Sequence, residues 1–284
     1  PAQLQTWLWL AFFASFAVKM PMWPVHTWLP DALLEGPIGM AVVLAGLKLG
    51  TFGFIRFSIP LLPEASKSHT VVTVIMCLGI AAILYGAVMA LIQPDFRRLM
   101  AFSSISHLGF VMMGLFALNF QGLQGSLLTM INLGFSTAGL FFIAGFLYSR
   151  QQTTHLSAFG GMAQQVPLLA SFFLLIGLAS IGLPGTNGFV GEFLILLGTF
   201  KANWIFGAFA VTGVVFGAAY FLWYYERAIL GPLGKAVKNT MPCGTGVWSS
   251  GATRWVSAMC GVKRLDVLAH TGSLILNKHI CYLF

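Results

Sequence analysis

The sequence predicts an all-α polytopic membrane protein. Hydrophobic residues make up 58% of the 284 and charged residues only 8%, whereas soluble domains usually carry about 25% charged residues. The apolar stretches form runs of about 18 to 30 residues, long enough to cross a bilayer, and backbone hydrogen bonding requires such runs to be helical. We therefore expect about seven transmembrane helices, one of them broken.

Apolar runs separated by polar or helix-breaking segments predict the crossings. They lie near residues 5–22, 38–57, 70–92, 99–118, 122–148, 166–200 and 203–230. The sixth run is too long for one straight crossing, and GLPGTNGFVG at 182–191 places glycines and a proline in its middle. Freed backbone groups at membrane depth need neighbouring protein or a water-filled cavity. The sixth run is therefore predicted to be a broken helix.

Residues 1–231 are predicted to form a transmembrane domain and residues 232–284 a basic tail. The tail has no run long enough to span, so we interpret it as a solvated or headgroup-facing segment, with an unnatural terminus as the alternative. Nucleic-acid binding is not inferred from its charge. The chain begins directly in an apolar run without a signal peptide, so we expect an excerpt of a longer protein. The cysteines form no CxxC pair, so neither a metal site nor a disulfide framework is predicted; they are Cys77, Cys243, Cys260 and Cys281.

Lysine and arginine residues indicate the orientation of the chain. One set of loops holds Arg97, Arg98, Arg150 and Arg227, and the other holds Arg56, Lys67 and Lys201. The bias is small. By the positive-inside rule it puts the loop at 23–37 and the end after Arg227 on the cytoplasmic side.

Ionisable residues within the apolar runs are candidates for an ion path. They are Lys19, Lys48, His107 and Glu192. A charge at mid-membrane costs at least about 2.5–3.5 kcal/mol on insertion scales, so such residues usually face a cavity or a partner. Other interpretations stay open: Lys19 and, less easily, Lys48 could snorkel, His107 could be a hydrogen-bonded packing residue, and Glu192 could cap a helix. The prolines directly after Lys19 are expected to end or kink its helix.

The loop after the first run carries supporting candidates. His26 and Asp31 are expected there, and Trp23 and Trp28 suit an interfacial aromatic belt. Asp31 and Glu35 either set the field at a cytoplasmic entrance or are simply hydrated, and hydration is favoured.

Three long motifs resemble one protein family. They are FAVKMPMWPVHTWLPDA, LIQPDFRRLMAFSSISHLGF and GLPGTNGFVGEFLILLGTF, and the likeness covers about residues 1–231 in order. The motifs are similar to the antiporter-like membrane subunits of respiratory complex I, the proton-pumping NADH:quinone oxidoreductase, and the subunit M type (chain 4 in mitochondria) fits best. Subunits of Mrp-type sodium/proton antiporters and of membrane-bound hydrogenases share parts of the pattern.

The resemblance implies the second half of an inverted-repeat antiporter-like fold, namely the second repeat plus one helix. It places Lys19 in the broken helix that begins this repeat, Lys48 as the central relay lysine, His107 as the bridging residue and Glu192 as the exit-side acid. The implied function is proton translocation coupled to quinone reduction elsewhere in the complex. The enzyme label of a translocase then belongs to the assembled complex.

The resemblance also implies surroundings for the chain. NADH, FMN, iron–sulfur clusters and quinone would be used elsewhere in the complex, so no cofactor is expected in this chain. The implied partners are the L-type and N-type antiporter-like subunits and the lipid bilayer. The implied location is the bacterial inner membrane, or the mitochondrial inner membrane if the gene is organellar.

The sequence departs from the family pattern in three places. The first six helices are missing, and with them the glutamate that would pair with Lys19. The segment between Pro37 and Lys48 is two residues shorter than the pattern, and two residues rotate a helix by ~200°. Leu133 stands where the family usually has a second histidine, and leucine cannot relay a proton. An Mrp-type antiporter subunit and a non-transporting structural spacer or relic therefore stay open as alternatives.

Overall fold

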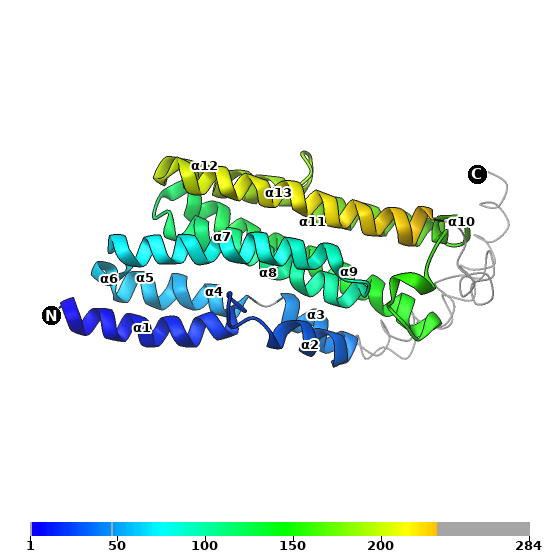
Figure 1. Cartoon of the computed structure of the whole chain (residues 1–284), viewed down its shortest axis with the longest axis horizontal. Helices are drawn as coiled ribbons and strands as arrows, with labels where there is room; N and C mark the ends of the chain where they lie inside the picture. The colour runs from blue at the N-terminus through cyan, green and yellow to red at the C-terminus, as the bar shows by residue number, and fades with distance from the viewer. Residues whose placement is uncertain (1, 47, 232–284) are drawn as a thin grey trace, which may run out of the picture.

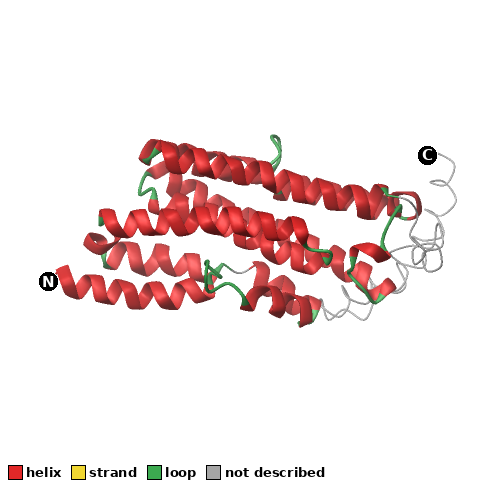
Figure 2. Cartoon of the chain, in the orientation of Figure 1, coloured by secondary structure: helices red, strands yellow, loops and turns green. Residues whose placement is uncertain are grey.

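The computed structural model describes residues 2–46 and 48–231, which form an elongated bundle of helices. Figure 2 shows helices and connecting loops throughout this part of the chain, and the strand-like pairing within it is one isolated bridge between Asp95 and His155. The predicted all-α class is therefore confirmed. The predicted tail at 232–284 lies outside the described residues.

Each predicted run contains helix. The long helices are α1 (Ala2–Lys19), α7 (His69–Ile92), α8 (Phe96–Phe116), α9 (Phe120–Gln151) and α13 (Trp204–Tyr225), which continues as a π-helical turn, Glu226–Leu230. The second run contains α3 (Ile38–Gly46), α4 (Leu49–Gly53), a π-helical turn (Phe54–Ser58) and α5 (Ile59–Leu61). The sixth run contains α11 (Pro167–Ser180) and α12 (Asn187–Ala202). Short helices α2 (Trp28–Glu35), α6 (Pro63–Lys67) and α10 (Met162–Gln165) and a 3-10 turn (Leu156–Ala158) complete the described part.

Helical stretches long and apolar enough to cross a membrane occur five times in the described residues. They are Ile38–Leu61, which runs across residue 47 outside the described part, His69–Ile92, Phe96–Phe116, Phe120–Ser149 and Trp204–Leu230, and α11 is a shorter apolar helix. The chain is therefore a multi-pass membrane protein.

Helix α8 lies at the centre of the bundle. Its spanning stretch is wholly buried by other helices. Asp95 is the N-cap of this helix: its side chain accepts hydrogen bonds from the backbone N–H groups of Arg97 and Arg98. Its closest neighbour is α7, where a Cβ on Gly86 would lie 2.8 Å from the backbone nitrogen of Ser106. Glycine thus lets the two backbones approach closely.

Three helices are interrupted near the middle of the bundle's long axis (Figure 1). The first interruption separates α1 from α2 and follows Lys19, as the prolines predict, and the third separates α11 from α12 at 181–186, as predicted for the sixth run. The second was not predicted, because the run 38–57 suggested a continuous helix. Lys48 has non-helical backbone angles, φ −93° and ψ 55°, and α4 begins after it.

The segment at 23–37, predicted as a loop, contains helix α2, so Asp31 lies in the first turn of a helix and not in a loop. Two arginines of α8 hold this helix. Arg97, only 6% exposed, donates from Nη1 to the carbonyl oxygens of Leu34 at 2.9 Å and Gly36 at 3.4 Å. Arg98 forms an ion pair with Asp31 at 3.4 Å. Arg97 therefore caps the C-terminal end of α2 from a buried position, in addition to counting toward the orientation of the chain in the membrane.

Candidate functional site

The two lysines line one cavity. Its volume is about 830 Å³, and α1, α2, α3, α4 and α8 all contribute to its wall. The lining is mainly apolar, and its polar side chains are those of Lys19, Lys48, Thr51 and Ser104. Lys19 is the last residue of α1, where the partial negative charge of the helix C-terminus favours a cation. Two candidates from separate apolar runs thus share one space.

The backbone break sets the position of Lys48. Its Nζ atom donates to the carbonyl oxygen of Ala45 at 2.5 Å, and Thr51 donates its hydroxyl to the carbonyl oxygen of Lys48 at 2.7 Å. Gly50 lets α4 approach the end of α1, because a Cβ there would lie 2.7 Å from the Cβ of Met20. Lys48 faces the same cavity as Lys19, so the shortening expected before Lys48 does not turn the lysine away from it. A non-helical residue is a place where such a length difference can be absorbed.

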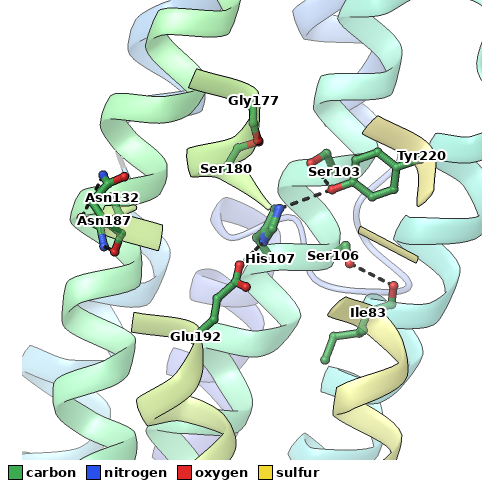
Figure 3. A network of polar contacts seen from close by, with 10 residues as sticks. All are labelled: Ile83, Ser103, Ser106, His107, Asn132, Gly177, Ser180, Asn187, Glu192 and Tyr220. Atoms are coloured by element: carbon green, nitrogen blue, oxygen red, sulfur yellow. Dashed lines mark hydrogen bonds and ion pairs between the residues drawn. The ribbon is translucent and has the colours of Figure 1, made fainter. Parts of the chain in front are cut away.

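His107 and Glu192 form a buried pair inside the bundle. The Nδ1 atom of His107 lies 3.1 Å from Oε1 of Glu192, and the side chains are 6% and 8% exposed (Figure 3). The contact has an ion-pair distance without the angle of a hydrogen bond. Glu192 stands in the second turn of α12, whose N-cap is Thr186. The interpretation of Glu192 as a simple helix cap is therefore wrong.

Close packing against α9 and against the helix break places Glu192. A Cβ on Gly191 would collide with the hydroxyl of Thr129 on α9. On the other side, Gly182 has a positive φ of 69°, and a Cβ there would collide with Oε2 of Glu192. The interruption between α11 and α12 thus forms part of the wall around the carboxylate.

Tyr220 and Ser103 extend the pair on the other side of the imidazole ring. The Oη atom of Tyr220, on α13, lies 3.3 Å from Nε2 of His107 and 2.6 Å from Oγ of Ser103. Sequence reasoning did not single out Tyr220, because a tyrosine in an apolar run carries no sign of its partner. Ser103 lies four residues before His107 in the motif LIQPDFRRLMAFSSISHLGF, but the motif does not indicate a contact with α13.

Helix α8 lies between the lysine cavity and the buried pair. Ser104 and Leu108 line the cavity, and His107 follows Ser104 by three residues, which places the two about 60° apart around a helix. The Ser104 hydroxyl is buried and has no hydrogen-bond partner among the described residues. Leu133 belongs to the same buried apolar cluster as Leu108. Lys19 and Lys48 thus share a cavity, and His107 and Glu192 are in contact. Helix α8 lies between the two groups and contributes residues to both.

His26 and Asp31 lie apart from both groups. His26 is 4% exposed, and its ring packs edge-on against Tyr85 with the centroids 4.8 Å apart. Asp31 is exposed beside Arg98, which agrees with the favoured hydrated interpretation. Neither residue lines the cavity. Trp28 does, and its Nε1 donates to the carbonyl oxygen of Val18 at 3.0 Å.

Sequence comparison gives relatives for most of the chain. The family described as NADH:quinone oxidoreductase/Mrp antiporter, transmembrane, matches residues 2–217. NADH-quinone oxidoreductase subunit M of Rhodobacter capsulatus is 48% identical over 240 residues, covering 84% of this chain and 46% of that protein. NADH-ubiquinone oxidoreductase chain 4 of Marchantia polymorpha is 46% identical over 229 residues, covering 80% and 46%. The chain thus spans about half the length of these relatives.

Structural comparison agrees. A chain of respiratory complex I from Thermus thermophilus superposes with a TM-score of 0.78 at 37% identity, covering 93% of this chain and 54% of that one. A chain of the Mrp complex from Dietzia sp. gives a TM-score of 0.74 at 21% identity, covering 94% and 57%. The second match shows a shared fold.

Proposed function

The chain belongs to the NADH:quinone oxidoreductase/Mrp antiporter transmembrane family, and from this premise we propose that it is a proton-translocating membrane subunit of an NADH:quinone oxidoreductase. The relatives at 48% and 46% identity carry the names of such subunits, in a bacterium and in a plant. A bacterial inner membrane, or a mitochondrial one, is the corresponding location. The partners proposed are L-type and N-type antiporter-like subunits, and the redox cofactors belong to other subunits of the complex.

One observation carries the proposal: a buried histidine–carboxylate pair lies directly behind the wall of a cavity that contains two lysines. Ionisable side chains inside a membrane are rare, and substrate or ion pathways and proton relays are among the functions that they mark. In the proposed path, Lys48 releases a proton from the cavity, the proton passes the Ser104 side of α8 to His107, and His107 passes it to Glu192. Each donor and acceptor is a group that binds and releases a single proton.

Lys19 has a different role in this path. It shares the cavity with Lys48, so its positive charge disfavours a second positive charge there. A change in the charge or position of Lys19 therefore changes how readily Lys48 gives up its proton. This coupling allows an event elsewhere in the complex to control proton release.

The alternatives have weaker support. The likeness to the Mrp complex chain at 21% identity concerns the fold alone, while the relatives at 48% and 46% identity are named for NADH oxidoreductases. A structural spacer would need no buried ionisable pair, and such a pair costs desolvation free energy.

The test compares variants of the buried pair with a variant of an exposed glutamate, in the complex that contains this chain. Inside-out membrane vesicles are supplied with NADH, and proton uptake is followed with a pH-sensitive dye and divided by the rate of NADH oxidation. We expect His107→Gln and Glu192→Gln to lower this ratio, and Glu64→Gln, at an exposed position on α6, to leave it unchanged. An unchanged ratio in both buried variants would sink the proton path and favour a spacer.

A further inference from the structure

We propose that the outer surface around the break between α11 and α12 binds a transmembrane helix of another subunit, and that this helix presents a hydroxyl or carboxamide side chain to it. The inference rests on the proposed function, which places the chain in a membrane complex of several subunits, and it adds where a partner binds and by which chemistry. We call this region the break surface, and it consists of Leu128, Asn132 and Phe135 on α9, the loop residues 183–185, and Asn187 and Val190 on α12.

Two asparagines form a pair at membrane depth. Asn132 lies near the centre of the spanning stretch Phe120–Ser149, and Asn187 is the first residue of α12. Nδ2 of Asn132 donates to the carbonyl oxygen of Asn187 at 2.6 Å, and Nδ2 of Asn187 donates to Oδ1 of Asn132 at 3.3 Å. Figure 3 shows this pair apart from His107 and Glu192.

The two amides satisfy each other only in part. A carboxamide has two hydrogens to donate and an oxygen that accepts, so each Nδ2 keeps a second hydrogen after the contact within the pair. Oδ1 of Asn187 has no hydrogen-bond partner among the described residues. Donors and an acceptor therefore remain open at the centre of a spanning helix.

The loop between α11 and α12 adds exposed backbone at the same depth. It projects from the bundle near the middle of its long axis (Figure 1). Leu183 is 43% exposed, and a Cβ on Gly185 would meet nothing within 4 Å. The backbone N–H of Gly185 has no partner within the described part of the chain. Irregular backbone is not tolerated against lipid hydrocarbon, which offers no hydrogen bonds, so lipid alone does not suit this surface.

Large apolar side chains surround the open polar groups. Leu128 and Phe135, 39% and 73% exposed, stand four residues before and three residues after Asn132, and thus on the same side of α9. Val190, 51% exposed, stands three residues after Asn187 on α12. An apolar surface with a polar centre fits a transmembrane helix that carries a polar residue among apolar ones, because such residues hold membrane helices together by hydrogen bonds.

The open groups also indicate the chemistry of the partner residue. They are uncharged, and they include both donors and an acceptor. A hydroxyl or a carboxamide both donates and accepts, so Ser, Thr, Asn and Gln match this surface, whereas an entirely apolar helix leaves its polar groups unpaired.

Exposed hydroxyls on other helices behave differently and provide a control. Ser171 on α11 donates to the carbonyl oxygen of Pro167 at 2.9 Å, and Thr212 on α13 donates to that of Phe209 at 2.7 Å. Each hydroxyl hydrogen is thus used within its own helix, and neither side chain needs a partner for it. Thr212 therefore serves as an exposed polar residue outside the break surface.

The first experiment identifies what touches the break surface in the complex that contains this chain. The photoreactive residue p-benzoylphenylalanine replaces Phe135, and native membranes are irradiated. We expect a covalent adduct with another subunit, located by mass spectrometry within one helical turn of a Ser, Thr, Asn or Gln in a transmembrane helix. Adducts only with lipid, with a second copy of this chain or with another segment of the same polypeptide overturn the proposal. A partner helix without those residue types near the adduct overturns it too.

The second experiment tests the amides. Asn187→Leu removes the side chain but keeps the carbonyl oxygen that accepts from Asn132, so this tie between α9 and α12 remains. We expect the fraction of the chain that detaches from the complex in mild detergent to rise about fivefold, as for one lost hydrogen bond between membrane helices. Thr212→Val should leave that fraction unchanged. Native gels measure both variants, and equal detachment in the two contradicts the proposal.

The outcomes separate this inference from the proposed function. An adduct with a polar helix of another subunit, together with normal proton uptake in His107→Gln and Glu192→Gln, supports the break surface and overturns the proposed function. Adducts with lipid alone, together with lost proton uptake in those two variants, overturn the break surface and leave the proposed function standing.

Discussion

The Nδ1 atom of His107 lies 3.1 Å from the Oε1 atom of Glu192, in the interior of a membrane-spanning bundle. Glu192 is the buried acid among the described residues. Its partner comes from the central helix α8, and its surroundings come from the interruption between α11 and α12. The carboxylate of Glu192 thus lies between the imidazole of His107 and the chain at Gly182.

Gly182 controls the space for the carboxylate. A Cβ there would collide with Glu192 Oε2, and Gly182 has a φ of 69°. We expect Gly182→Ala to displace Glu192 and lower proton uptake per NADH. Gly185→Ala is the control, because Gly185 also has a positive φ, 96°, but a Cβ there meets nothing within 4 Å. Both variants carry backbone strain of about 1–2 kcal/mol, so equal losses of proton uptake would contradict the role given to Gly182.

Lys19 and Lys48 share a cavity, so their effects should differ in kind. We expect Lys48→Met to reduce the rate of proton uptake by about 10²-fold, in the range of a lost acid–base group. Lys19→Met removes only a neighbouring charge. Lys19→Arg keeps that charge, so the rate of proton uptake that is lost in Lys19→Met should be recovered in Lys19→Arg. Lys67→Met, on the short helix α6, is the exposed control. Failure of Lys19→Arg to restore any proton uptake would show that more than the charge of Lys19 matters.

Ser104 is expected to connect the cavity with α8, since its buried hydroxyl lines the cavity and has no partner in the described bundle. We expect Ser104→Ala to slow proton uptake about fivefold, equivalent to a hydrogen bond of ~1 kcal/mol, without loss of thermal stability. Ser106→Ala should lower the thermal stability and leave the rate of proton uptake unchanged, because Ser106 donates to the carbonyl oxygen of Ile83 at 3.0 Å. Thermal melting and dye quenching on both variants check this pair, and similar behaviour of the two would refute it.

Arg97 and Arg98 are adjacent but should differ in their effect on stability. Arg97 is buried, donates to two carbonyl oxygens at the C-terminal end of α2 and lies over the ring of Tyr148 at 4.8 Å. We expect Arg97→Ala to lower the free energy of unfolding by ~1.5–3 kcal/mol, as for a lost charged hydrogen bond. Arg98→Ala removes an exposed ion pair with Asp31, which is worth ~0–1 kcal/mol. Melting temperatures of the two variants, measured side by side, decide whether the contrast holds.

Sequence patterns predicted the features that depend on local chemistry. The break within the sixth run followed from its glycines and proline, and the end of α1 followed from the prolines after Lys19. The four ionisable residues were found because charges are rare in apolar runs. The roles given to Lys19, Lys48, His107 and Glu192 are still predictions.

Features that depend on tertiary contact escaped the sequence analysis. The segment around Lys48 is apolar and carries no proline, so nothing local predicts its non-helical backbone. His26 was placed in a loop but is covered by the ring of Tyr85. Tyr220 meets His107 because α13 and α8 lie together, and its helix alone contains no trace of that partner.

The burial of α8 also has a consequence for how the chain is inserted during synthesis. A nascent helix that carries His107 and three nearby serines gains less from partitioning into lipid than an entirely apolar one. Helix α7 is more apolar than α8 and precedes it in the chain, so it can enter first and shield one side of α8 as a hairpin. The face of α8 that packs on α7, with Ser106 on it, would then be covered before it meets lipid, and the order of insertion would protect that polar face.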